Sequence, residues 1–406
     1  MAETGNGPAR GGRAARLLRE GGGPSRATFL ELFFDLIFVF ALARVSERLV
    51  DDFVTAGLPA AAGQTTLLLL AIWLVWLVAA WVTSRYDPEQ PAIELIIVGI
   101  MLGTLLMAVA TPEAFGSRAP LFAAAYVGVQ VGRSLVLVIL LRGHEQQRVP
   151  ARLLFWSAVS ATPWIAGAAL APGTATVALW TFAVALDYLG LLFGWPTPGL
   201  GRARIGQWRI AAEHLADRYQ QFLIIALGEA FALVGLAFSR GALTLDRTVG
   251  FLVAFVSTVL LWRVYFFRAG FLLREAVAVA SRPARLSQVA AYSHLAMVAG
   301  ILATAVGHEL VIDEPGRHVE AAWLAVILGG PTVFIAGRAW LEHDIFGRVS
   351  RPRLAGLIAL PALAPVLAHA PPLVATSVAT LVLAGVALAD AVQERRWPRA
   401  RPMPRG

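Results

Sequence analysis

The residues of this sequence that could bind a ligand or carry protons are those with ionisable side chains inside long apolar stretches. A charged group at the centre of a bilayer costs about 2.5–3.5 kcal/mol on insertion scales, so it normally faces a packed interior or a wet cavity. Acids, guanidinium groups and imidazoles in such places can bind a small polar or charged solute and can carry protons. The candidate binding residues are Glu31, Asp35, Arg133, His214, Asp217, Arg218, Glu229 and His294.

The segment from His214 to Glu229 has the longest polar stripe. In an α-helix one face would carry His214, Asp217, Arg218, Gln221 and Glu229. At about 1.5 Å per residue the stripe measures about 22 Å, which takes it beyond the middle of a membrane. A solvated helix start would explain the residues up to Arg218 but not Glu229. We therefore predict that Glu229 is functional.

Two acids open the first apolar run, Glu31 and Asp35, and their spacing of four residues places them on one face of a helix. Glu31 either has a structural role or contributes to a site. In a structural role it would snorkel to the membrane interface, as Asp35 also could, or cap the helix start, where an acid meets the positive end of the helix dipole. Asp35 lies deeper and has a short side chain. We expect it to be the buried partner of an arginine.

Arg133 lies past the middle of a later apolar run, as Arg263 does. A guanidinium group cannot become neutral by losing its proton, so each arginine needs an acid. The acids at a similar predicted depth are Asp35, Glu94, Asp187 and Asp217.

His294 is either a hydrogen-bonded packing residue or a titratable ligand. A metal site made by His214, Glu229 and His294 is conceivable, but the sequence has no HxxxH or HxxE cluster. Cysteine is absent, which excludes disulfides and thiolate metal sites. We predict no metal, no cofactor and no catalytic residue.

The amino-acid composition indicates the class of protein to which these residues belong. The chain has 406 residues, of which 58% are hydrophobic and 15% charged, and its mean hydropathy is +0.68. These values exclude a soluble protein of this length. The formal charge of +8 comes from arginines between apolar blocks, which the positive-inside rule explains without a nucleic-acid partner. The chain is therefore predicted to be an all-α, polytopic bundle in a lipid bilayer.

Apolar stretches long enough to cross a hydrocarbon core of about 30 Å predict about 12 spans, with ten as the lower bound. Their ranges are 29–49, 65–83, 92–111, 119–141, 152–171, 175–195, 217–238, 248–268, 287–308, 320–341, 352–369 and 372–392. Arginine separates between alternate loops, since one side keeps only Arg118, Arg240, Arg247 and Arg317. Both termini are therefore predicted to be cytoplasmic.

Four segments follow from this topology. Residues 1–27 are predicted to be a disordered Arg/Gly-rich arm, and residues 394–406 a basic tail. Between them, residues 28–200 and 201–393 would form two six-helix halves. Short similarities occur in the same order in both halves, such as Gly132-Arg133 and Gly337-Arg338. Because each half has six spans, the halves would be parallel repeats.

Two motifs resemble the bacterial low temperature requirement A family of membrane proteins. They are Glu31-Leu-Phe-Phe-Asp35-Leu and the run from His214-Leu-Ala-Asp217-Arg218 to Gly228-Glu229. Shorter matches extend the resemblance from Thr28 to about Trp340, although the family usually has Glu where this chain has Asp217. The resemblance implies a polytopic protein of a bacterial inner membrane, from a family named for growth in the cold and without a settled biochemical activity.

The leading hypothesis is a secondary transporter that binds a small polar or charged solute and couples to protons through Glu229 or Asp35. The sequence has no ATP-binding GxxxxGK[ST] loop and no GxSxG elbow, which argues against a primary pump and a serine hydrolase. One alternative is an intramembrane enzyme acting on a lipid through His214, Asp217 and Glu229. Another is a structural or regulatory membrane component whose ion pairs hold helices together.

Overall fold

The computed structural model describes residues 16–19, 27–55, 58–169, 173–203, 209–266, 273, 276, 283–317 and 320–396. Over these residues the chain is helical, with two isolated β-bridges and no strand. The chain divides into two compact units. The first comprises residues 1–41 and 66–211, and the second residues 42–65 and 212–406. Each unit is described by itself.

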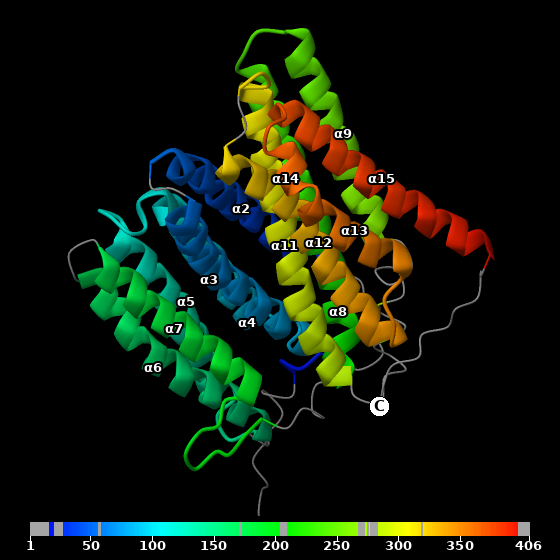
Figure 1. The fold of residues 1–406 in the computed structure, drawn as a ribbon. Coiled ribbons are helices and arrows are strands. Elements are labelled where there is room, and N and C mark those ends of the chain that lie inside the picture. Colours follow the sequence, from blue (N-terminus) through cyan, green and yellow to red (C-terminus); the bar gives the residue numbers. More distant parts are fainter. Residues whose placement is uncertain are drawn as a thin grey trace, which may run out of the picture. The chain divides into compact units, whose positions relative to one another are not determined.

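The helices are coloured along the chain in Figure 1. In chain order they are α2 (Phe29–Thr55), α3 (Leu58–Arg85), α4 (Pro91–Ala110), α5 (Ala119–Leu140), α6 (Arg148–Ala169), α7 (Thr174–Phe193), α8 (Arg209–Ser239), α9 (Leu245–Tyr265), α11 (Pro283–Asp313), α12 (Ala321–Phe346), α13 (Arg351–Ala362), α14 (Ala364–Leu367) and α15 (Pro372–Arg396). Residues 1–41 and 66–211 include the first part of α2, most of α3, and α4 to α7.

The all-helical, membrane-spanning class predicted from composition is confirmed. Within the described residues, nine helices are long and apolar enough to cross a membrane. The predicted ranges 29–49, 152–171 and 352–369 have no counterpart among the nine. The first two correspond to the helices α2 and α6, with 27 and 22 residues. The count of twelve spans and the internal repeat stay predictions.

The predicted span 352–369 is divided in the structure. The helix α13 has 12 residues, which extend about 18 Å, well short of a hydrocarbon core of about 30 Å. It ends just after Pro361, and the single turn α14 begins with Pro365 in its first positions. Proline lacks the N–H of the helical ladder and crowds the preceding turn. Apolar length alone therefore overestimated the helix in this segment.

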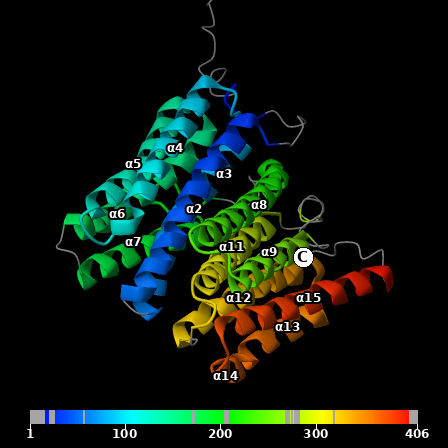
Figure 2. The ribbon, with the colours of Figure 1, turned by 90° about the horizontal axis from the view of Figure 1, so that it is seen from above.

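In the first unit α4 packs on α5, α5 on α6 and α6 on α7, as the two views show (Figures 1 and 2). Aromatic side chains fill the space between α5, α6 and α7. Trp164 and Trp180 have ring centroids 4.8 Å apart, and the ring of Phe122 stacks on Trp180 at 5.4 Å. The indole of Trp180 donates a hydrogen bond to the Trp164 carbonyl. These large rings fix the spacing of the helices that carry Arg133 and Asp187.

In the second unit α11 lies along α12 (Figure 1), and glycines bring the two backbones together. A Cβ built on Gly330 would lie 2.5 Å from the backbone nitrogen of Thr304. A Cβ on Gly300 would lie 2.5 Å from the backbone nitrogen of Phe334. Small residues at helix crossings permit this close approach in membranes, where packing rather than hydrophobicity drives association.

Replacing Gly330 by alanine is expected to lower the free energy of unfolding by roughly 1–3 kcal/mol, because the methyl group would force α11 and α12 apart. The adjacent Gly329 is the matched control, since a Cβ there has nothing within 4 Å. The Gly329→Ala variant should be as stable as the wild type or slightly more stable. Thermal unfolding in detergent would measure both, and equal midpoints for the two variants would contradict the close contact.

Part of the predicted N-terminal arm is ordered against the end of α3. Leu18 and Tyr86 form an antiparallel bridge, and the Asp87 N–H donates to the Leu17 carbonyl at 2.9 Å. Burial raises the pKa of Tyr86, and the charge of Arg85 opposes this rise. At the other terminus, α15 continues to Arg396. The rest of the arm, and the tail from residue 397, lie outside the described residues.

Candidate functional site

Glu31 and Asp35 are both fully buried on α2. The Thr28 N–H donates to Glu31 Oε2 at 2.8 Å, and the Glu31 N–H donates to Thr28 Oγ1 at 3.3 Å. This reciprocal pattern is a capping box, so Glu31 has the capping role that was one of its two interpretations. Asp35 Oδ1 accepts a hydrogen bond of 3.0 Å from the indole Nε1 of Trp76 on α3.

Inside the α4–α7 bundle, a chain of hydrogen bonds joins Arg133 on α5 to Asp187 on α7. Arg133 Nη2 donates to Gln130 Oε1 at 2.6 Å, and Gln130 Nε2 donates to the Tyr126 hydroxyl at 3.2 Å. The Tyr126 hydroxyl then donates to Asp187 Oδ2 at 2.7 Å. Every donor in this chain is directed toward the carboxylate, so a positive and a negative group are linked through two neutral ones.

The structure brings Arg133 close to Asp187, which was one of the four acids at a similar predicted depth. The two charges act on each other, although no direct ion pair is formed between them. Among the described residues, Arg133 Nε and Nη1 have no hydrogen-bond partner. Arg133 is only 4% exposed, so this guanidinium group keeps donors that an entering anion could use.

In the second unit, His294 on α11 lies between two tyrosines. Its Nε2 is 2.7 Å from the Tyr265 hydroxyl, and its Nδ1 is 2.6 Å from the Ala290 carbonyl oxygen. Because a carbonyl can only accept, Nδ1 carries the hydrogen, and Nε2 of the neutral ring accepts from Tyr265. The ring of Tyr219 on α8 stacks on the imidazole at 4.9 Å. This geometry fits the packing role that was left open for His294.

Next to Tyr265 lies a group of buried charges that we call the arginine quartet: Arg338, Glu342, Arg353 and Asp390. Arg353 donates 2.6 Å hydrogen bonds to Glu342 Oε2 and to Asp390 Oδ2. Arg338 donates a hydrogen bond to the Val264 carbonyl and interacts electrostatically with the other three residues. Two guanidinium groups thus balance two carboxylates between α12, α13 and α15.

The sequence analysis did not identify this quartet. Arg338 and Glu342 were assigned to the end of a span and to the loop after it, whereas α12 continues to Phe346 and buries both. Their spacing of four residues was a usable signal, because it places an arginine and an acid on one face of a helix.

The polar residues at the start of the α8 stripe are also placed inside. His214 and Arg218 are buried, and Asp217 is partly buried. Arg218 Nη1 donates to Gln221 Oε1 at 3.3 Å. Tyr219, the next residue, donates to the Ser287 carbonyl on α11. The first half of the stripe is therefore largely buried, and the neighbouring Tyr219 contacts α11.

Glu229 lies further along α8 and is only 1% exposed. The side chain of Ser46 lies beside it, and the two charges that act on it are those of Glu47 and Glu309. Both neighbours are acids. Among the described residues, Glu229 Oε2 has no hydrogen-bond partner.

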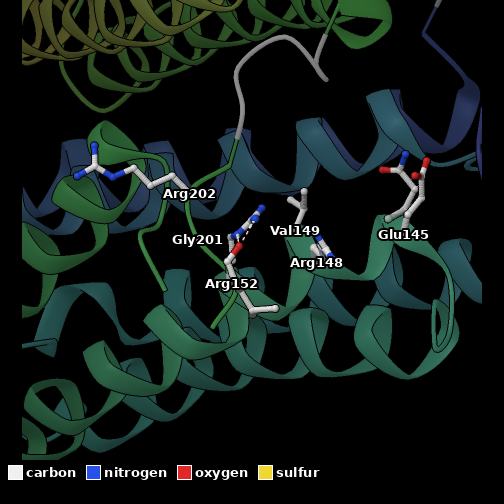
Figure 3. Close-up of a pocket in the computed structure, with 8 residues that line it drawn as sticks. Glu145, Arg148, Val149, Arg152, Gly201 and Arg202 are labelled. Carbon is white, nitrogen blue, oxygen red and sulfur yellow. Dashed lines mark hydrogen bonds between the residues drawn. The ribbon is translucent and has the colours of Figure 1, made fainter. Parts of the chain in front are cut away.

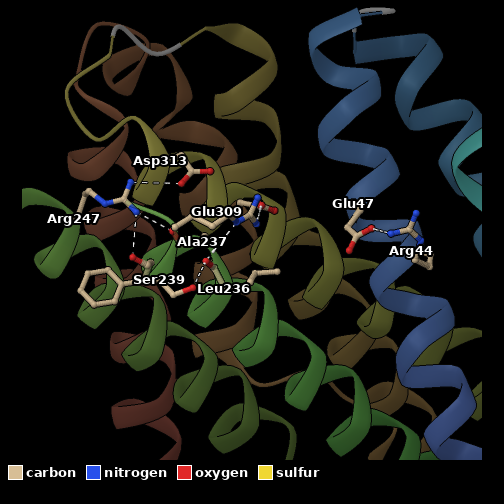
Figure 4. A network of polar contacts seen from close by, with 10 residues as sticks. Arg44, Glu47, Leu236, Ala237, Ser239, Arg247, Glu309 and Asp313 are labelled. Atoms are coloured by element: carbon tan, nitrogen blue, oxygen red, sulfur yellow. Dashed lines mark hydrogen bonds and ion pairs between the residues drawn. The ribbon is translucent and has the colours of Figure 1, made fainter. Parts of the chain in front are cut away.

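The arginines of this region are bound to other groups (Figure 4). Arg240 forms a 2.8 Å ion pair with Glu309, and Arg44 pairs with Glu47. Arg247 donates to the carbonyls of Ala237 and Ile312 and lies 3.5 Å from Asp313. These residues and Glu229 form what we call the Glu229 cluster. In the described part of the chain, no group of three or more His, Asp or Glu side chains is arranged to hold a metal ion.

Comparison with known proteins identifies the family of this chain. A model of the bacterial low temperature requirement A protein family matches residues 26–388, which is most of the chain. The chain belongs to this family. An uncharacterized protein of Rhizobium meliloti (strain 1021) is 34% identical over 330 residues, which cover 80% of each chain. No solved structure matches significantly.

The two motifs that resemble the low temperature requirement A family lie on α2 and α8. The first contains Glu31 and Asp35, and the second runs from His214 to Glu229. Both motifs place charged side chains in the interior. The region that the family model matches includes both motifs, but the match supplies no reaction for them.

Proposed function

We propose that this protein is a secondary transporter of a small polar or charged solute, and that Glu229 binds and releases the coupling proton. The observation that supports it best is the environment of Glu229. This carboxyl group is buried in an apolar helix, has acids as charged neighbours and keeps one oxygen without a hydrogen bond among the described residues. An intramembrane carboxyl group of this kind is typical of proton relays.

A purely structural carboxylate would be expected to look different. Asp390 accepts a 2.6 Å hydrogen bond from a buried arginine, and so does Glu342. Among the described residues of the Glu229 cluster, by contrast, Arg240 pairs with Glu309, Arg44 pairs with Glu47, and Arg247 binds Asp313 and backbone carbonyls. A proton is then the simplest partner that can neutralise Glu229.

A route between Glu229 and water is supported by the adjacent ion pair. The Glu309 side chain is 7% exposed, whereas the side chain of its partner Arg240 is 52% exposed. The pair therefore joins the buried cluster to the surface at the end of α8. We place this end outside the cell and both termini in the cytoplasm of a bacterium, on the basis of the arginine distribution between loops.

A structural or regulatory membrane component is the second candidate, and the arginine quartet favours it. All four of its charges are buried, and they balance each other. Such groups can hold helices in one arrangement without binding anything. The two candidates differ in what they expect of Glu229, which only a transporter needs as a titrating group.

Proteoliposomes test the proposal. We expect vesicles that contain the purified protein and a trapped pH dye to show proton flux when one class of solute is added on one side. A panel of amino acids, organic acids, polyamines and sugars, applied with and without a pH gradient, would identify this class. Empty vesicles are the control. Flux no greater than in empty vesicles across the whole panel would count against transport.

A further inference from the structure

A cavity of about 610 Å³ lies in the first unit, where α6 begins and the loop after α7 passes over it (Figure 3). This volume is in the usual range of small-molecule sites. Its lining includes Arg148 and Arg152 on α6, Arg202 on the loop, and one acid, Glu145. In Figure 3, Arg148 and Arg152 lie on successive turns of the helix, and the side chain of Arg202 extends away from both.

The loop that forms one wall is held firmly. The indole Nε1 of Trp156 donates to the Pro196 carbonyl at 3.1 Å, and the Ala203 N–H donates to the Gly194 carbonyl at 2.8 Å. Within the loop, Thr197 and Gly201 exchange backbone hydrogen bonds, and Gly201 has a φ of +68° that favours glycine. Hydrogen bonds therefore fix the position of the loop that forms this wall of the cavity.

One arginine is used to hold this wall, and two remain available. Arg152 donates from Nε and Nη2 to the Leu200 carbonyl and is largely buried. Arg148 lies one turn before it, and the two positive charges repel each other. In the described part of the chain, Arg148 and Arg202 make no side-chain hydrogen bond or ion pair. An anion bound beside Arg148 would relieve the repulsion between Arg148 and Arg152.

We propose that this cavity binds a phosphate-bearing anion. Guanidinium groups match phosphate oxygens with paired N–H donors, and three of them line a cavity that has one carboxylate. The cavity also lies at the start of α6, a helix of 22 residues, where the helix dipole favours negative charge. The anion is either a soluble phosphate compound or the phosphate of a lipid headgroup.

The positive-inside rule accounts for arginine in this loop, but it does not account for the arrangement. Arg142 belongs to the same connection, is exposed and does not line the cavity. Arg148 and Arg202 come from segments far apart in the sequence and border the same enclosed space. The inference does not depend on the proposed transport, because the cavity and the Glu229 cluster belong to different units.

The test uses the full-length protein in nanodiscs of phosphatidylcholine and measures pyrophosphate binding by calorimetry and thermal unfolding. The variant is Arg148→Gln/Arg202→Gln, which leaves Arg152 to hold the loop. Because hydrogen bonds from charged donors to the anion are lost, we expect the double variant to raise the Kd at least about tenfold. Arg142→Gln removes a charge from the same connection and should bind like the wild type.

Nanodiscs that contain phosphatidylglycerol separate the two sources. Pyrophosphate binding that persists in both kinds of nanodisc supports a soluble ligand. If phosphatidylglycerol stabilises the wild type but not the double variant, and pyrophosphate then adds nothing, a lipid phosphate occupies the cavity. The proposal is overturned if Arg142→Gln and the double variant weaken binding equally. It is also overturned if neither phosphate source binds the wild type.

Discussion

Replacing Arg353 by methionine is expected to lower the free energy of unfolding by about 3–5 kcal/mol, because it leaves buried carboxylates without their partner. Arg353 is 1% exposed and donates 2.6 Å hydrogen bonds to both Glu342 and Asp390. With Arg353 removed, both carboxylates would lose their hydrogen-bonded cation, and only the more distant positive charges of Arg338 and Arg263 would act on Asp390. Unfolding in detergent, followed by circular dichroism, would measure the loss.

Arg351 provides the matched control for this prediction. It lies two residues earlier on the same helix and is exposed, so Arg351→Met removes the same charge and should change stability little. A third variant, Arg353→Met/Asp390→Asn, leaves one arginine, Arg338, and one acid, Glu342, in the quartet. It should recover part of the lost stability if uncompensated acids cause the loss. A single variant as stable as Arg351→Met would show that Arg353 does not hold these helices together.

The helices were predictable because membrane-length apolar runs allow few other structures. In a bilayer, a backbone without internal hydrogen bonds is costly, so each long apolar run becomes a helix. The run from 352 to 369 was the exception, since Pro361 and Pro365 break the ladder that apolar length implies. A count of apolar residues has no means of registering this missing donor.

The choice of buried charges was predictable, but their partners were not. Burial of Asp35, Arg133 and Glu229 follows from their place in apolar runs, and the structure buries all three. Their contacts depend on how helices pack. Arg133 reaches Asp187 through Gln130 and Tyr126, and nothing in one sequence specifies such an indirect connection.

Helix ends were the main reason why the arginine quartet was missed. Glu342 falls just after the predicted span 320–341, and Arg353 falls in the first turn of the predicted span 352–369, so neither was predicted to lie deep in the protein. In the structure α12 ends at Phe346 and α13 begins at Arg351, so both side chains turn inward. Boundaries are the least reliable part of any reading of sequence, and here they decided which charges counted as buried.

Replacing Glu229 by glutamine is expected to reduce solute-driven proton flux to the level of empty vesicles. Glutamine has nearly the shape of a protonated glutamate, but its amide cannot bind and release a proton near neutral pH. The acids near Glu229, which are Glu47 and Glu309, would no longer have a third carboxyl group beside them. The variant should therefore fold normally, with an unfolding midpoint at or above that of the wild type.

Glu94→Gln is the matched control, since it makes the same chemical change at an exposed position in the first turn of α4. It should keep wild-type flux. Glu229→Asp, which keeps a carboxyl group on a shorter side chain, should retain part of the coupling. These three variants separate the two candidate functions. If the protein is a transporter, only Glu229→Gln should abolish the flux, and this variant should be as stable as the wild type.

A structural component makes the opposite prediction for the same variant. If Glu229 served only to hold helices, its replacement would change the unfolding midpoint and would leave any flux in proportion to folded protein. Full flux in folded Glu229→Gln would therefore remove Glu229 from the proton path. The environment of Glu229 argues against that result, because a structural carboxylate needs a cation. The described arginines of the Glu229 cluster are bound to Glu309, Glu47, Asp313 and backbone carbonyls.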